Sequence, residues 1–133
     1  MSLSYEPRIQ GGRLWKRFRL GPCMAEVLTD LQSLGLVQYE HVLRVASPDT
    51  GETLLWVASE RNASWDPADV QGTLGSHFLG VFPGDGHRNL GASCDWADLE
   101  RFSVRALEVA REQLGIEEEA EELPGPEDRG EPR

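Results

Sequence analysis

The stretch His77–Glu112 reads HFLGVFPGDGHRNLGASCDWADLERFSVRALEVARE, and most of the fold prediction depends on it. Residues 78–82 form an apolar run that predicts a strand, and residues 83–91 follow as a glycine-punctuated polar loop. From Trp96 onward, apolar residues recur at helical spacing until Gly115, which predicts an amphipathic helix. A loop between a strand and a helix N-terminus presents backbone N–H groups, so residues 83–91 are the first candidate site.

The segment before that stretch predicts a strand, a helix and a hairpin. Alternating apolar residues predict the strand over residues 13–20. A Gly-Pro pair followed by apolar residues at helical spacing predicts a helix over residues 22–34. Residues 37–46 and 53–59 then predict two strands, because a turn-forming Ser-Pro-Asp-Thr-Gly sequence lies between them.

These elements occur in the order β-α-β-β-(α)-β-α, where the bracketed helix is a short one over residues 66–70. We therefore expect the α+β class, with a small antiparallel or mixed sheet of about four strands and two main helices on one face. A ferredoxin-like arrangement with an added C-terminal helix fits this order, and an antiparallel meander is the alternative. We expect an N-terminal arm over residues 1–12, a single domain over 13–116, and an acidic, proline-containing, disordered tail over 117–133.

The composition is typical of a soluble globular protein. The chain has 133 residues, of which 39% are apolar and 27% charged. No apolar run is long enough to span a membrane, and no secretory signal is visible at the N-terminus. The two cysteines are too few for a disulfide framework and suit a reducing compartment. We therefore expect a cytoplasmic protein that does not bind membranes.

The charge of the chain indicates which partners it can have. A formal net charge of −10 makes nucleic acid an unlikely partner, because phosphate neutralisation needs surplus Lys and Arg. Residues 1–20 nevertheless carry five basic residues against one acid, and residues 116–133 carry eight acids against two arginines. Strand alternation predicts that Trp15, Arg17 and Arg19 project from one face and form a partner-binding surface. The expected partner is another protein or a second copy of this chain.

The loop over residues 83–91 is the candidate site for a small ligand, an anionic one in particular. Its glycines let the backbone approach a ligand, and Arg88 supplies positive charge. The glycine spacing matches neither a P-loop nor a dinucleotide-binding fingerprint. The candidate ligand-binding residues are Gly84, Asp85, Gly86, His87, Arg88 and Asn89.

Other reactive residues give weaker candidates. Cys94 beside His87 or His77 would resemble an activated thiol, but no recognisable signature surrounds it. These three residues and Asp85 also lack the short spacing that preorganises a metal site. His41 lies on the apolar face of its strand and is interpreted as structural. We expect no catalytic residue, no metal ion and no cofactor.

The sequence therefore favours a non-catalytic protein-interaction or regulatory module of the cytoplasm. A small-ligand or anion sensor that uses residues 83–91 is the alternative. A small enzyme is the third interpretation, and it requires His87, Arg88 and Asp85 to converge in a pocket.

Overall fold

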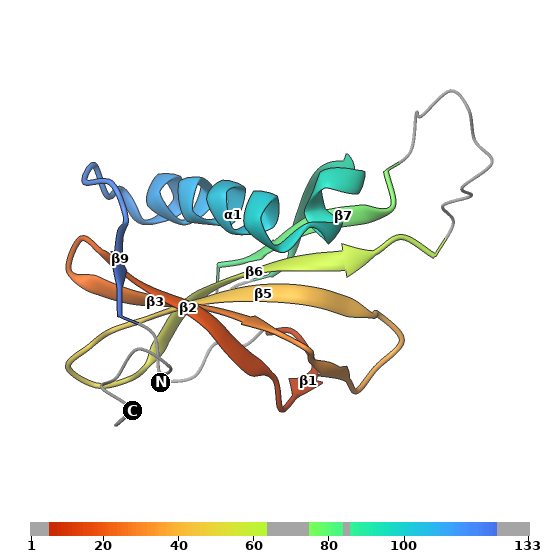
Figure 1. Ribbon diagram of the computed structural model, residues 1–133, viewed down its shortest axis with the longest axis horizontal. Helices are drawn as coiled ribbons and strands as arrows, with labels where there is room; N and C mark the ends of the chain where they lie inside the picture. Colours follow the sequence, from red (N-terminus) through yellow and green to blue (C-terminus); the bar gives the residue numbers. More distant parts are fainter. Residues whose placement is uncertain (1–5, 64–74, 84–85, 125–133) are drawn as a thin grey trace, which may run out of the picture.

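The computed structural model describes residues 6–63, 75–83 and 86–124 and consists mostly of β-structure (Figure 1). Its main sheet has seven strands in the antiparallel order β8-β7-β6-β5-β3-β2-β9. Those strands are β2 (Arg13–Leu20), β3 (Cys23–Thr29), β5 (Tyr39–Ala46), β6 (Thr53–Arg61), β7 (His77–Phe82), β8 (Arg88–Ser93) and β9 (Glu121–Leu123). A two-stranded sheet pairs β1 (Ile9–Gln10) with β4 (Gln32–Ser33), and a 3-10 turn, η1 (Cys94–Ala97), precedes the helix α1 (Leu99–Leu114).

The predicted fold class is wrong. The described residues contain nine strands and one α-helix, which makes the fold mainly β rather than α+β with two main helices on about four strands. Apart from β4, which belongs to the two-stranded sheet, the strands from β2 to β8 have the same order along the chain and across the main sheet. That arrangement is an antiparallel meander, so the ferredoxin-like arrangement is excluded.

The helix expected over residues 22–34 is the main source of the error. This segment contains β3 and β4, and its burial alternates: Ala25 and Val27 are fully buried while Glu26 between them is half-exposed. The apolar residues of this segment have helical spacing, but Cys23, Ala25 and Val27 also alternate as in a strand, and pairing with β2 and β5 selects the strand. Gly21, at a φ of 57°, starts the two-residue turn between β2 and β3, where glycine is favoured at the first position.

The second predicted helix is present, but it begins later than expected, because residues 94–97 form the 3-10 turn η1 and α1 starts at Leu99 rather than near Trp96. The carboxylate of Asp98 caps α1 by accepting a hydrogen bond from the Arg101 backbone N–H at 2.9 Å. Gly115 ends the helix in the left-handed conformation, at a φ of 67°. One side of α1 is buried against the sheet, through Phe102, Ser103, Ala106, Leu107, Val109 and Ala110.

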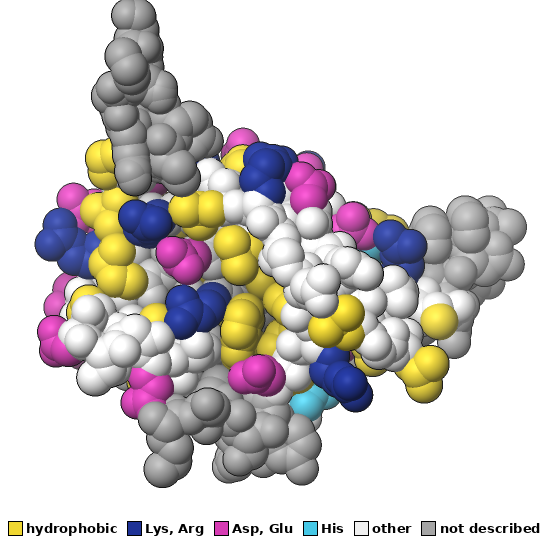
Figure 2. Space-filling view, turned by 90° about the horizontal axis from the view of Figure 1, so that it is seen from below, with side chains coloured by type: hydrophobic (Ala, Val, Ile, Leu, Met, Phe, Trp, Pro, Cys, Tyr) yellow, Lys and Arg dark blue, Asp and Glu magenta, His cyan; other side chains and the backbone are white. Residues whose placement is uncertain are grey.

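The core lies between α1 and the face of the sheet that α1 covers, which we call the helix face (Figure 1). Strand residues such as Leu43, Val57 and Val81 are buried there against Phe102. The other side of the sheet, the opposite face, carries a smaller cluster of Val42, Ala58 and Phe82, with half-buried residues around it. Figure 2 shows this face, where apolar side chains gather along the middle between charged side chains of both signs.

The two ends of the described chain also take part in the sheets. Residues 9–10, within the expected N-terminal arm, form β1. Residues 121–123, within the segment expected to be disordered, form β9 and pair with β2. The short helix expected over residues 66–70 lies outside the described residues. No helix in the described part of the chain is long and apolar enough to cross a membrane.

Candidate functional site

The segment 83–91 does not join a strand to a helix N-terminus. It connects β7 to β8, and its last residues belong to β8, which pairs antiparallel with β7. Of the candidate ligand-binding residues, Gly84 and Asp85 lie outside the described residues. Gly86, His87, Arg88 and Asn89 are described, at the end of the hairpin and at the start of β8.

His87 reaches back onto the opposite face and contacts Glu60 of β6. The distance from His87 Nε2 to Glu60 Oε2 is 2.7 Å, and the imidazole lies 4.7 Å from the Phe82 ring, centroid to centroid. The Glu60 side chain is 8% exposed and the His87 side chain 38%. Gly80 leaves the room for this pair, because a Cβ there would lie 2.1 Å from Glu60 Oε2 and 2.7 Å from His87 Nε2.

Burial dominates the electrostatics of Glu60. It raises the pKa of the carboxyl, although the charge and hydrogen bond of His87 act in the other direction. Tyr39 is the cross-strand neighbour of Glu60, and burial, followed by the charge of Glu60, raises the pKa of Tyr39 to about 12. When the Glu60 carboxyl is ionised, it can only accept hydrogen bonds, so His87 Nε2 is then the donor and Nδ1 is the other ring nitrogen.

The neighbours of His87 along the chain lie elsewhere. Arg88 Nη2 is 3.5 Å from Gln113 Oε1 of α1, which places its guanidinium on the helix side of the sheet. Asn89 Oδ1 accepts a hydrogen bond from the Gly91 backbone N–H at 2.8 Å. His87 and Arg88 therefore diverge, and Asp85 lies outside the described residues. The convergence that the enzyme interpretation requires is not found in the part of the chain that the structure describes.

A second carboxylate–imidazole pair joins Glu40, near the start of β5, to His77, at the start of β7. His77 Nε2 is 3.2 Å from Glu40 Oε1, and Arg61 Nη2 lies 3.0 Å from the same oxygen. Ser76 Oγ lies 2.7 Å from His77 Nδ1, so both ring nitrogens have partners. Burial alone would raise the pKa of Glu40, but the hydrogen bonds and charges of Arg61 and His77 together lower it.

The remaining histidine is structural, as predicted. His41 is buried on the helix face, with Thr29 Oγ1 2.9 Å from Nδ1 and the Ala97 carbonyl oxygen 2.9 Å from Nε2. Both cysteines are free thiols: Cys94 is exposed, and burial raises the pKa of Cys23. Within the described ranges, no three His, Cys, Asp or Glu residues are placed to share a metal ion.

The basic strand β2 is paired with acidic residues of the chain itself. Arg17 Nε lies 3.5 Å from Glu26 Oε2 of the neighbouring strand β3. Arg19 Nη2 lies 3.0 Å from Glu121 Oε1, and Lys16 Nζ lies 3.4 Å from Glu122 Oε1, both on β9. Two basic residues from the N-terminal part of the chain, Lys16 and Arg19, therefore meet two acidic residues from its C-terminal part, Glu121 and Glu122, at one edge of the sheet.

The expectation that Trp15, Arg17 and Arg19 share one face is wrong. A β-bulge between Leu14 and Lys16 shifts the register, and Trp15 packs against the core of the helix face. Beyond the bulge, normal alternation places Arg17 and Arg19 on the opposite face, since Phe18 between them is buried on the helix face. Lys16 Nζ lies 4.6 Å from the Trp15 ring centroid, which stabilises this cation on the helix side.

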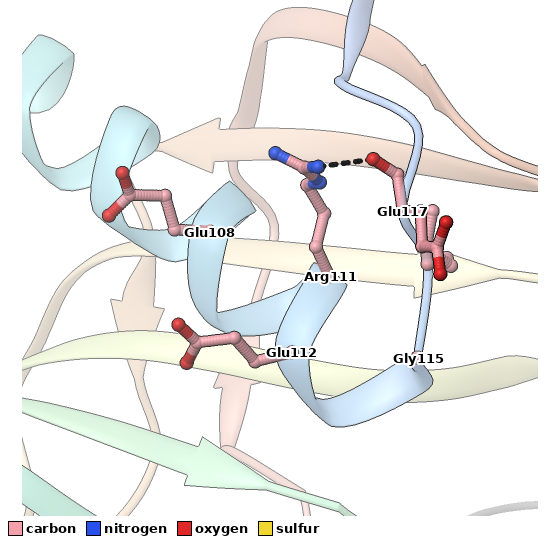
Figure 3. Close-up of a pocket in the computed structure, with 6 residues that line it drawn as sticks. Glu108, Arg111, Glu112, Gly115 and Glu117 are labelled. Carbon is pink, nitrogen blue, oxygen red and sulfur yellow. Dashed lines mark hydrogen bonds between the residues drawn. The ribbon is translucent and has the colours of Figure 1, made fainter.

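A hollow of about 550 Å³ lies beside the C-terminal end of α1 (Figure 3). It is lined by Glu108, Arg111, Glu112, Gly115, Ile116 and Glu117. Arg111 extends toward Glu117 and donates a hydrogen bond to its backbone oxygen. The guanidinium therefore ties the segment after α1 to the helix, and that segment leads to β9.

A smaller hollow of about 330 Å³ lies over the first turns of α1, where Trp96 and Val104 provide apolar surface. Two pairs of opposite charge lie on its rim, and Glu100 also lines it. Arg101 Nη1 lies 2.9 Å from Asp95 Oδ1, and Arg105 Nη1 lies 3.1 Å from Glu108 Oε1. Both hollows are therefore lined mostly by charged side chains of both signs.

Comparison of the chain with models of protein families, with curated proteins and with solved structures finds no match. No relative therefore assigns a role to any residue of this chain. Two features remain as candidates on physical grounds. One is the Glu60–His87 pair on the opposite face, and the other is the basic edge of β2 with the acidic strand β9. Sequence reasoning missed Glu60 and Glu40, because nothing in the local sequence indicates which histidine a strand glutamate will meet.

Proposed function

We propose that the chain is a non-catalytic protein-interaction module, and that the outer edge of β2 binds an acidic, extended segment of a partner protein. One observation carries the proposal. An acidic segment of the chain itself lies on this edge as β9, held by strand pairing and by two ion pairs. Addition of a strand to a sheet edge is a common mode of peptide recognition.

The edge of β2 offers more pairing surface than β9 uses. β2 has eight residues and β9 has three, which pair only with Arg17, Phe18 and Arg19. Within the described residues, positions 13–16 have no strand on that side. A longer partner strand would gain backbone hydrogen bonds there that the internal segment does not make.

The contacts of β9 are of the kind that a partner can replace. Its two glutamates are exposed, with 62% of the Glu121 side chain and 55% of the Glu122 side chain accessible. Exposed ion pairs contribute about 0–1 kcal/mol each. Leu123 is only half-buried. By contrast, Ile116 and Ala120 pack against the core, so the segment that leads to β9 is held more firmly than β9 itself.

Charge selects the partner. Lys16 and Arg19 favour a glutamate-rich strand, and the same chemistry is present in residues 117–122 of a second copy of this chain. The anion-sensor alternative has less support, because Arg88 lies against α1. We also propose the cytoplasm as the compartment, since free Cys23 and Cys94 are compatible with a reducing environment.

The test uses a fluorescent peptide with the sequence of residues 117–124 and measures its binding by anisotropy. We expect a chain truncated after Glu119 to bind the peptide more tightly than the full chain, because the internal competitor is gone. The double variant Lys16→Glu, Arg19→Glu should lose roughly tenfold in affinity, and binding should weaken as salt rises.

The matched control is the double variant Arg101→Glu, Arg105→Glu, which makes the same change of charge on the exposed side of α1. It should leave peptide binding nearly unchanged. A folded, truncated chain that does not bind the peptide would contradict the proposal, and so would an equal loss in both double variants.

A further inference from the structure

We propose that Glu60, Phe82 and Gly80 form a binding site for a small planar organic cation, such as an imidazolium or guanidinium group, and that the His87 ring occupies this site as an internal ligand. The proposal concerns the opposite face at the end of the β7–β8 hairpin. It is independent of the function proposed for the edge of β2.

The carboxylate of Glu60 is the recognition group. Its side chain is 8% exposed, and fully buried Val42 and Ala58 lie on the same face of the sheet. Within the described residues, its side-chain hydrogen bond is the one to His87 at 2.7 Å. A buried carboxylate is costly unless it is paired with a cation or a strong donor, so this position favours a positively charged N–H group.

The Phe82 ring supplies an aromatic contact for the group that pairs with Glu60. The His87 and Phe82 rings are 4.7 Å apart with an interplanar angle of 49°, within the distance at which an aromatic face attracts a cation. Gly80 leaves room for the pair, because a Cβ there would lie 2.1 Å from Glu60 Oε2 and would force the carboxylate to shift. Tyr39, across the strand from Glu60, is the other titratable side chain at the site.

His87 itself shows how a ligand would enter. Its side chain is 38% exposed, whereas the carboxylate that it contacts is buried, so the ring reaches the site from the solvent side. A free cation that approaches from the same side can make the same two contacts: an N–H of the cation donates a hydrogen bond to Glu60 Oε2, and its planar group packs against the Phe82 ring. The molecule contains a comparable contact between Arg61 and Glu40, in which a guanidinium nitrogen lies 3.0 Å from the carboxylate.

The test uses imidazole as the probe and the melting temperature of the full chain as the readout. His87→Ala removes the internal ligand, so imidazole should raise the melting temperature of this variant in a saturable way. Wild type should respond as well, with a half-saturating concentration roughly tenfold higher, because His87 competes for the site. The double variant His87→Ala, Glu60→Gln should lose the response.

Two further measurements keep the test decisive. Circular dichroism establishes whether His87→Ala is folded; if it is not, the titration of wild type is followed by the NMR signals of the His87 ring, which should shift on displacement. Absence of a saturable response in both chains would overturn the proposal. A response of His87→Ala without one of wild type would also overturn it, since His87 would then be a structural contact only.

Discussion

The two carboxylate–imidazole pairs use the same residue types on neighbouring strands, yet their burial is reversed. In the pair Glu40–His77, the imidazole is 8% exposed and the carboxylate 34%. In the pair Glu60–His87, the carboxylate is 8% exposed and the imidazole 38%. The difference that matters is Arg61, which contacts Glu40 and so gives that carboxylate a permanent positive partner.

The pKa values of the two glutamates move in opposite directions for this reason. Arg61 and His77 together lower the pKa of Glu40 in spite of its partial burial. Burial raises the pKa of Glu60, and His87 offsets this only in part. Burial of a carboxylate is therefore tolerated in two ways: a fixed guanidinium makes Glu40 a structural residue, while Glu60 depends on a group that a ligand can replace.

The largest effect should come from removing the space that the second pair needs. Gly80→Ala should lower the free energy of unfolding by about 1–3 kcal/mol, because the new Cβ would lie 2.1 Å from Glu60 Oε2. Urea denaturation measures the change. Gly35→Ala is the control, since its Cβ would lie 3.7 Å from the Arg8 side chain, an ordinary contact. Glu60→Ala in the Gly80→Ala background should recover part of the loss; no recovery would show that the strain lies elsewhere.

A smaller effect should separate the two glutamates at neutral pH. Glu40→Gln should destabilise the protein by about 1 kcal/mol, because it weakens the hydrogen bonds to Arg61 and His77. Glu60→Gln should change stability by less than about 0.5 kcal/mol or raise it, since a neutral amide is easier to bury and its oxygen can still accept from His87. Equal losses in the two variants, measured by urea denaturation, would mean that both pairs are structural in the same way.

The smallest effects should appear in the pH dependence, with opposite signs. The folded-state pKa of Glu40 lies below the ordinary value of 4.5, so its contribution to stability is present above pH 4.5 and is lost as the pH falls below it. The folded-state pKa of Glu60 lies above 4.5, so its contribution is complete below pH 4.5 and declines as the pH rises through the raised value.

Urea denaturation between pH 3 and pH 8 tests this contrast, with each Gln variant compared with wild type. The stability that Glu40→Gln loses should shrink toward acidic pH. The free energy of unfolding of wild type should exceed that of Glu60→Gln most at acidic pH, and this difference should decline as the pH rises. Parallel curves for the two variants would contradict the assignment.

Local sequence information was sufficient where one periodicity dominates. The strand over residues 13–20 was predicted with the bounds that the structure has. The end of the last helix at Gly115 was also predicted correctly, because its apolar residues keep helical spacing and a glycine follows them, but its start was placed too early, since residues 94–97 form a 3-10 turn. His41 was predicted as structural from its position on an apolar strand face, and its two hydrogen bonds confirm this.

The candidate sites could be predicted only in part. The loop over residues 83–91 was singled out for its glycines and charges, and its His87 does take part in an unusual pair. Its partner Glu60 is 27 residues away on another strand, and only the β6–β7 pairing brings it close. Likewise, the charge asymmetry was visible in the sequence, but the register of β9 on β2 was not, since three-residue pairings leave no periodic signal.

The sequence by itself determined the amphipathic helix, the N-terminal basic strand and the segregation of charge, because each depends on residues close together in the chain. Only the tertiary structure decided that residues 23–29 form a strand, since their apolar spacing fits two periods and pairing with β2 and β5 selects one. It also decided which glutamate meets which histidine and which of them keeps a permanent cation. Strand pairing and burial are properties of contacts between distant segments, so local preferences do not contain them.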